Sequence, residues 1–171
     1  GYLDTVLEGA YRHGHFQGVC QVMNRLLKTV QPNLLYMGQK DYQQCMVIKR
    51  LLQISQLPID LVTCPTVREK DGLAMSSRNQ RLNISQRQKA VGIYYALMHI
   101  QGNILPGSLK SLKRKAMALL EQYEFNIDYV EIADAVSLEI VEEWDGKQKL
   151  VALVAAYQDE VRLIDNMLIL P

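Results

Sequence analysis

The chain has 171 residues, of which 49% are hydrophobic and 22% are charged. This length suffices for one ordinary domain or two small ones with a buried core, and the composition excludes collagen-like and disordered chains. Because 19 basic residues are balanced by 18 acidic ones, for a net charge of +1, no overall field attracts nucleic acid or anionic lipid, and any site for a polyanion must be local.

Three cysteines, Cys20, Cys45 and Cys64, are odd in number and lie in apolar runs, which fits neither a disulfide framework nor a zinc site. We expect them to be reduced core residues of a cytoplasmic protein. No apolar run approaches the roughly 18 residues of a membrane span, so no membrane partner is expected. Since the sequence opens at Gly1 without a methionine and soon reaches a motif-dense segment, we expect it to be the later part of a longer protein.

Apolar positions predict a helix over residues 19–30, because they recur at helical spacing along one face. This face consists of Val19, Val22, Met23, Leu26, Leu27 and Val30. The apolar run 34–37 before Gly38 predicts a short strand that is buried on both faces. A second helix is expected over residues 41–56. Its inward side chains would be Cys45, Ile48, Leu51, Leu52 and Ser55.

Pro58 separates this helix from a second predicted strand over residues 59–63. Strands that alternate with helices favour right-handed crossovers and a parallel sheet covered on both sides. Ligands bind such sheets beyond the carboxyl ends of the strands, where residues 38–41 and the segment from Pro65 lie. The first part of the chain is therefore predicted to be a partial Rossmann-like sheet.

The pattern changes after a polar loop at residues 64–83, which is long enough to suggest a function as well as a domain junction. Residues 85–88 have a capping-box pattern that opens a helix to about residue 101, and another helix is predicted over 109–123. Strands and turns then follow, with strands at 127–133, 149–157 and 161–169 and turns at Asp145-Gly146 and 158–160. Short turns favour antiparallel pairing, so we predict a small α+β domain after the parallel sheet.

A first polar segment, Gly38 to Gln44, lies at the turn from the predicted strand into the helix. A helix start presents free N–H groups, and Lys40 adds a mobile cation that suits phosphate. Asp41 could accept from ribose hydroxyls, and Gln44 could bind a polar substrate. The structural alternative is an N-cap with a solvated lysine.

A second segment covers residues 65–79, where Ser76 and Ser77 stand beside Arg78. Two hydroxyls and a guanidinium can bind a polyphosphate, since the hydroxyls donate to its oxygens and the guanidinium is a planar charged fork. The alternative is a solvated interdomain linker, because the basic residues of the segment are partly offset by acidic ones.

A third segment covers residues 12–18, with His13 and His15 around Gly14. A metal site is improbable, since no Cys, Asp or Glu lies nearby to complete it. We interpret the segment as a loop that delivers His15 or Arg12 to a substrate carboxylate, with a purely structural turn as the alternative.

Together the stretches LEGAYRHGHFQGV, GQKDYQQ and PTVREKDGLAMSSRN resemble, in order and separation, those of pantothenate synthetases, also called pantoate–β-alanine ligases. Residues 162–166, Arg-Leu-Ile-Asp-Asn, also resemble that family, so the likeness spans essentially the whole chain. The resemblance implies an ATP-dependent ligase that condenses pantoate with β-alanine through a pantoyl adenylate and releases AMP and pyrophosphate. Residues 1–66 would be the carboxy-terminal portion of a Rossmann-like ATP- and pantoate-binding domain, and residues 67–171 a small α+β lid domain.

The resemblance also implies roles for individual residues. Gln44 would bind pantoate, Val67 would contact adenine, and residues 75–78 resemble the mobile Lys-Met-Ser-Lys-Ser loop of related adenylating enzymes. The full set of expected ATP contacts is Gly38, Gln39, Lys40, Asp41, Val67, Met75, Ser76, Ser77 and Arg78. Of these, the charge-stabilising catalytic residues would be Lys40, Ser76, Ser77 and Arg78.

Two positions depart from the family, which usually has Pro in place of His13 and Glu in place of Gln39. Neither change removes an essential charge. The family's His-x-Gly-His signature and its Mg²⁺-binding acidic residues are expected upstream of Gly1, so no metal ligands are expected in this chain. The expected partners are pantoate, β-alanine and ATP, together with a second copy in a homodimer.

Two alternatives stay open. The chain could be a non-catalytic fragment that folds and self-associates without ligase activity. An RNA-binding relative of the adenylating enzymes is disfavoured by the near-neutral charge and by the lack of a basic, aromatic-rich stripe.

Overall fold

The computed structural model describes residues 1–170 and divides the chain into two compact units, Gly1–Pro65 and Thr66–Pro171. The first unit holds the parallel strands and the second the antiparallel ones, so the predicted fold class is confirmed. No helix in residues 1–170 is both long and apolar enough to span a bilayer.

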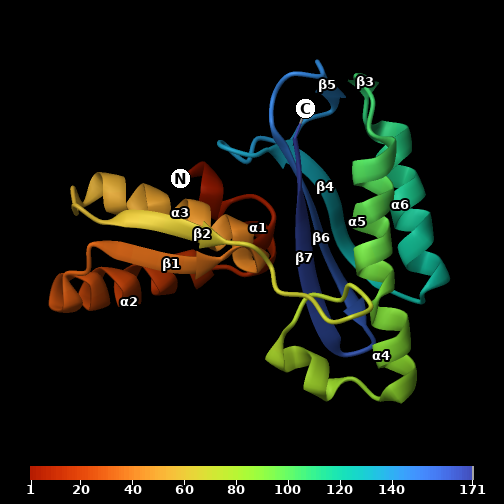
Figure 1. Cartoon of the computed structure of the whole chain (residues 1–171), viewed down its shortest axis with the longest axis horizontal. Helices are drawn as coiled ribbons and strands as arrows, with labels where there is room; N and C mark the ends of the chain where they lie inside the picture. Colours follow the sequence, from red (N-terminus) through yellow and green to blue (C-terminus); the bar gives the residue numbers. More distant parts are fainter. Residues whose placement is uncertain (171) are drawn as a thin grey trace. The chain divides into compact units, whose positions relative to one another are not determined.

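The first unit is a two-stranded parallel sheet with helices packed alongside it (Figure 1). Its elements are η1 (Tyr2–Asp4), α1 (Glu8–Tyr11), α2 (His15–Val30), β1 (Leu34–Gly38), η2 (Gln39–Asp41), α3 (Tyr42–Ile54) and β2 (Asp60–Cys64). The register pairs Leu34 with Asp60 and Gly38 with Cys64, so both strands end at the same edge.

Both long helices of this unit bury apolar residues in one small core. Leu27 of α2 packs there with Ile48 and Leu52 of α3. The inward face predicted for α3 is confirmed at Cys45, which is 0% exposed, and at these two residues.

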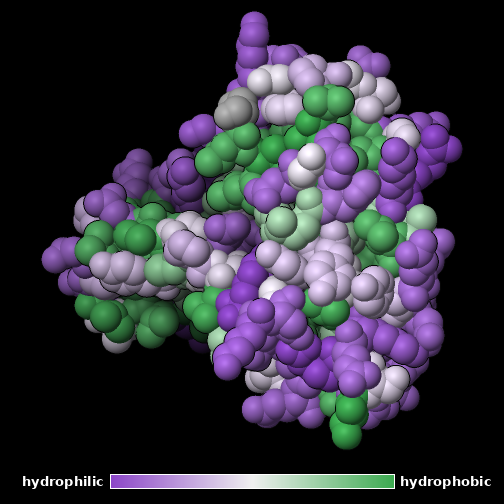
Figure 2. Space-filling view, turned by 45° about the vertical axis from the view of Figure 1, so that its right-hand side comes forward, coloured by the Kyte–Doolittle hydropathy of each residue, from purple (hydrophilic) through white to green (hydrophobic). Residues whose placement is uncertain are grey.

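The apolar residues of α2 and β1 are only partly buried. On α2 the stripe of Val22, Leu26 and Val30 is 65%, 50% and 61% exposed. On β1 Leu34 and Tyr36 are exposed, which contradicts the prediction of a strand buried on both faces. The reason is that α2 and α3 both pack on the sheet face that carries the alternate side chains of β1. In Figure 2 hydrophobic residues gather on the surface of the first unit, at the left of the view.

The second unit is a three-stranded antiparallel sheet with helices on one face (Figure 1). Its elements are η3 (Ser77–Arg81), α4 (Ile84–Ala90), α5 (Gly92–Asn103), β3 (Gly107–Ser108), α6 (Lys110–Gln122), β4 (Asn126–Asp134), β5 (Glu143–Trp144), β6 (Leu150–Gln158) and β7 (Val161–Ile169). The order is β4-β6-β7, with α5 and α6 packed over a large apolar core. The three predicted strands are therefore confirmed.

Two local predictions in this unit are wrong. Residues 85–101 do not form one helix, because α4 ends before Val91 and α5 follows it, and the N-cap is Asn83 instead of Ser85. Asn83 Oδ1 accepts from the Gln86 N–H at 2.9 Å, and Gln86 Oε1 accepts from the Asn83 N–H at 2.8 Å, so an overlapping capping box two residues earlier is the one that forms.

The Asp145-Gly146 turn does not close a hairpin. β5 pairs with β3, whereas β6 pairs with β4 and β7, so the turn joins strands of different sheets. Asp145 Oδ1 instead accepts from the N–H groups of Lys147 and Gln148 at 2.8 and 3.2 Å. The turn at residues 158–160 does close a hairpin, with Gln158 paired to Val161.

Candidate functional site

The first polar segment follows β1 directly. Gly38 ends the strand, and η2 then leads into α3 without a break. The Cys45 thiol of α3 donates to the Gly38 carbonyl at 3.4 Å and so connects the end of β1 to α3. Asp41 occupies the N-cap position of α3, but its exposed carboxylate accepts no hydrogen bond from the first turn. The structural alternative required this carboxylate to cap the helix, and it does not.

Gln44 and Lys40 are half-buried beside this turn, whereas the neighbouring Gln43 is 3% exposed. Gln43 Nε2 donates to the carbonyls of Leu3 and Val6 at 2.8 and 2.9 Å, and its Oε1 accepts from a third backbone group, the N–H of residue 8. Gln43 thus ties the start of the chain to α3. Sequence reasoning missed it, because local spacing does not show that Gln43 binds the backbone of residues 3–8.

The third segment forms a tight turn that starts α2. Gly14 has φ +74°, a left-handed conformation that favours glycine, and the His15 N–H donates to the Arg12 carbonyl at 3.0 Å. Arg12 Nη1 lies 3.9 Å from Glu8 Oε2, one helical turn earlier. Arg12 and His15, either of which was predicted to meet a substrate carboxylate, thus lie at the two ends of this turn.

In the second unit, the segment after β2 is a short hairpin followed by η3. The Met75 N–H donates to the Val67 carbonyl at 2.9 Å, and both side chains are exposed, Val67 by 67% and Met75 by 50%. Ser76 caps η3, since its Oγ accepts from the Arg78 N–H at 3.2 Å.

A cavity of about 530 Å³ opens at this hairpin. Its lining residues are Glu69, Met75, Ser76, Ser77, Asn79 and Gln80. The structure therefore brings both predicted serines and Met75 to one cavity. Arg78 does not line it, because Arg78 Nη1 donates to the Arg162 carbonyl on β7 at 3.2 Å.

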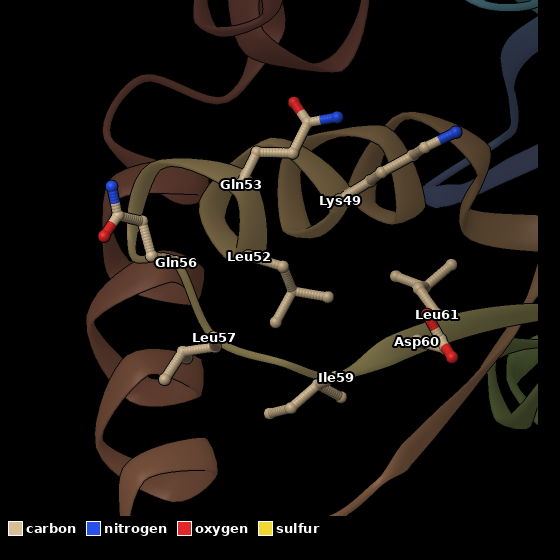
Figure 3. Close-up of a pocket in the computed structure, with 8 residues that line it drawn as sticks. All are labelled: Lys49, Leu52, Gln53, Gln56, Leu57, Ile59, Asp60 and Leu61. Carbon is tan, nitrogen blue, oxygen red and sulfur yellow. The ribbon is translucent and has the colours of Figure 1, made fainter.

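A different cavity, of about 380 Å³, lies in the first unit (Figure 3). It is lined by Lys49, Leu52, Gln53, Gln56, Leu57, Ile59, Asp60 and Leu61. It contains none of the predicted site residues and lies at the amino end of β2. Because parallel sheets bind ligands at the carboxyl ends of their strands, it is not the expected site.

The cysteines offer no nucleophile at the first segment. Burial, together with the charge of Asp41, raises the pKa of the Cys45 thiol to about 11, so the thiol is protonated at neutral pH. Burial and the charge of Asp4 also raise the pKa of Cys20. All three cysteines are free thiols, but only Cys45 is buried, and the prediction of core positions is wrong for half-buried Cys20 and Cys64.

The model of the pantoate-beta-alanine ligase family matches residues 2–168. The chain belongs to this family. The pantothenate synthetase of Cytophaga hutchinsonii is 40% identical over 173 residues, which cover 99% of this chain and 61% of that protein. The pantothenate synthetase of Moorella thermoacetica is 42% identical, covering 98% of this chain and 59% of its own length. The chain thus spans about three fifths of the length of these relatives.

Solved structures of the family share the fold. A pantothenate synthetase from Thermus thermophilus matches 100% of this chain and 62% of its own, with a TM-score of 0.89 at 40% identity. A pantoate-beta-alanine ligase from Francisella tularensis, complexed with beta-gamma ATP and beta-alanine, matches 98% of this chain and 56% of its own with a TM-score of 0.73 at 32% identity.

Proposed function

We propose that this chain carries part of an ATP-dependent ligase that condenses pantoate with β-alanine. In this reaction the pantoate carboxylate attacks the α-phosphate of ATP and releases pyrophosphate. The amine of β-alanine then attacks the acyl carbon of the pantoyl adenylate and displaces AMP. The observation that carries the proposal is the family match over residues 2–168, and the ligands of the Francisella tularensis protein, beta-gamma ATP and beta-alanine, support it.

The chemistry needs charge stabilisation and positioning, not an enzyme nucleophile. We assign charge stabilisation to Lys40 and Arg78, and phosphate contacts to Ser76 and Ser77, because cations and donors aimed at developing phosphoryl charge lower the barrier. Ser76 and Ser77 open on the cavity of the second unit. Arg78 would have to release the Arg162 carbonyl to reach a phosphate, as expected of a mobile loop.

The remaining assignments concern binding. Gly38, Gln39 and Asp41 would contact ATP with Lys40. Val67 would contact the adenine, which suits its exposed apolar side chain at the hairpin end.

The substrate side is assigned to polar groups of the first unit. Gln44 would bind pantoate. Arg12 and His15, held at the glycine turn, would receive a substrate carboxylate.

Magnesium is expected in the complete reaction as a counterion of the phosphates. Within residues 1–170 no group of three or more His, Cys, Asp and Glu side chains could hold a metal ion. No step is therefore derived through the metal. We place the metal ligands in the part of the relatives' length that this chain does not span.

Pantoate-dependent release of pyrophosphate from ATP tests the proposal. In the intact enzyme, Lys40→Ala should lower the rate by about two orders of magnitude, since losing one transition-state donor costs about that much. Lys49→Ala is the matched control, because Lys49 is an exposed lysine of the same unit but lies at the other cavity. Unchanged pyrophosphate release in Lys40→Ala would refute the role of Lys40.

A second candidate is a non-catalytic folded piece that self-associates as a homodimer. It is favoured by the three-fifths coverage of the relatives and by the exposed apolar residues of α2 and β1. Titration calorimetry with ATP separates the two candidates. ATP binding with no pyrophosphate release would favour a binding fragment. If the chain neither binds ATP nor releases pyrophosphate, ligase activity of this chain alone is excluded.

A further inference from the structure

The hairpin that precedes η3 carries two of the proposed ATP contacts at its open end. Three backbone hydrogen bonds close it, from the Met75 N–H to the Val67 carbonyl at 2.9 Å, from the Glu69 N–H to the Leu73 carbonyl at 2.8 Å and from the Gly72 N–H to the Glu69 carbonyl at 2.9 Å. A hairpin of this size is not stable by itself in water, so its geometry depends on what holds it from outside.

Arg68 provides the main connection from the hairpin to the sheet. Its guanidinium binds Asp165 of β7 with both nitrogens, Nη1 to Oδ2 at 2.6 Å and Nη2 to Oδ1 at 3.1 Å. Nη2 also donates to the Asn166 carbonyl at 3.3 Å, and Nη1 to the Gly72 carbonyl at 3.0 Å. The Asp165 side chain is 0% exposed and that of Arg68 is 21% exposed. This ion pair is bidentate and largely buried, and Arg68 also binds the tip of the hairpin at Gly72.

The helices hold the other side of the hairpin. The Arg68 guanidinium lies 4.9 Å from the centre of the Tyr94 ring of α5. Gly72 has φ +96°, and a Cβ there would come within 2.2 Å of that ring, so the hairpin tip approaches α5 more closely than any side chain allows. Asp71 binds Arg87 of α4 with two contacts, at 2.7 and 3.2 Å.

A buried pair of this kind is poor evidence for stability, because apolar residues of similar size often stabilise a core as well. The pair instead orients the hairpin relative to β7, since a planar guanidinium bound to a carboxylate through two nitrogens fixes both the distance and the angle between them. The two partners come from segments 97 residues apart in the sequence. Neither lines the cavity at Ser76 and Ser77.

We propose that the clamp of Arg68 and Asp165 is a positioning device that sets Val67 and the Met75–Arg78 segment in the geometry that receives ATP. Neither residue touches the nucleotide. The clamp acts through the hairpin, by holding its base on β7 while Tyr94 and Arg87 hold its tip. This inference rests on the proposed ATP site and adds to it the residues that shape it.

Hydrogen exchange and ATP titration of the folded chain test the clamp. In Arg68→Lys, which keeps the charge and loses the fork, the amides of Met75 and Glu69 should exchange at least about tenfold faster, with β6 unchanged. ATP affinity should fall about tenfold at a temperature where the variant is fully folded, which a merely structural role would not cause. The matched control is Lys89→Gln, which removes an exposed ion pair with Glu124 and should leave both readouts within about twofold.

A second variant keeps the proposal falsifiable if Arg68→Lys does not fold. The double variant Arg68→Met with Asp165→Asn removes both charges, so no buried charge is left unpaired. If the folded double variant keeps the exchange rates and ATP affinity of the unaltered chain, the clamp has no positioning role. If neither variant folds, the pair is a requirement of the fold and the proposal is overturned as well.

The two proposals fail separately. Exchange at Met75 and Glu69 decides whether the clamp orders the hairpin, with no ATP present. Lack of ATP binding by the unaltered chain would overturn the proposed ATP site, and with it the purpose assigned to the clamp, while leaving the exchange result as measured.

Discussion

Cys45 shows how one side chain can shape a site without reacting in it. Its thiol donates to the carbonyl of Gly38, where β1 ends, and its side chain is fully buried. A thiol in this position supports the backbone turn that leads to Lys40 and Asp41. The same burial, with the negative charge of Asp41, is what raises its pKa.

This predicts that Cys45 resists alkylation in the native chain. Its pKa of about 11, against an ordinary value of 9.0, lowers the thiolate fraction at pH 8 about 100-fold, and only the thiolate is the nucleophile. Iodoacetamide at pH 8 should therefore label Cys45 at least about 100-fold more slowly in the native chain than in denaturant, as read from the labelled peptide by mass spectrometry.

Half-buried Cys20 and Cys64 serve as internal controls in the same digest. The native rate at Cys45 should also rise with pH through pH 9 and 10, because its pKa lies above this range. A native rate at pH 8 equal to that in denaturant would show that Cys45 is neither buried nor protonated as described.

At the scale of elements, α4 illustrates how a sequence pattern can be right in kind and wrong in place. The residues Asn-Ile-Ser-Gln-Arg-Gln-Lys from position 83 contain two overlapping capping boxes. The box that forms uses Asn83 and Gln86, with both reciprocal hydrogen bonds present. Asn83 should therefore stabilise the helix start, and Ser85 should not.

Asn83→Ala should lower the free energy of unfolding of the second unit by about 0.5–2 kcal/mol, because it removes the acceptor of the Gln86 N–H. Ser85→Ala, two residues along the same helix, is the matched comparison and should change it by less than about 0.5 kcal/mol. Urea unfolding measures both. A larger loss in Ser85→Ala than in Asn83→Ala would restore the cap that the sequence pattern first suggested.

Local periodicity predicts the elements of this chain well, because the spacing of apolar residues within α3 or β6 is enough to indicate a helix or a strand. Burial was predicted less well, since the helical pattern of α2 marks six apolar positions but not which of them meet α3. The predictions that Leu34 is buried and that the Asp145 turn closes a hairpin were wrong for the same reason, because both depend on which elements pack together.

The candidate site shows a similar limit. A motif can mark Ser76 and Ser77, which do share a cavity, but it cannot show that Arg78 donates to the Arg162 carbonyl. The contact of Arg68 with Asp165 joins the segment 65–79 to residues 162–166, which are far apart in the sequence. Such partners are set by the folded chain, so local spacing carries no information about them.

At the scale of the whole chain, the two units differ in how well their own residues enclose a core. In the second unit, 21 buried residues form a core around the sheet and α5, including Trp144. In the first unit one core cluster holds four buried residues, Leu27, Ile48, Leu52 and Ile59. Leu7, Phe16, Tyr42, Cys45 and Val47 are buried outside that cluster. A unit of about this size buries a smaller share of its surface and is marginally stable.

We therefore expect the first unit to unfold at lower denaturant concentration than the second. Trp144 is the single tryptophan of the chain and lies in the second unit, where it is 8% exposed, so its fluorescence reports that unit alone. Far-ultraviolet circular dichroism reports the helices of both units. During urea unfolding the dichroism signal should begin to fall before the fluorescence changes, since two cores of unequal strength do not unfold in one step.

A fragment of residues 66–171 provides the control. It should reproduce the fluorescence midpoint of the intact chain within about 0.3 M urea and lose the early dichroism change, because its core is made of its own residues. Coincident fluorescence and dichroism transitions in the intact chain would contradict the expectation. They would mean that the small core around Leu27 and Ile48 unfolds together with the large one, and that the units share their stability.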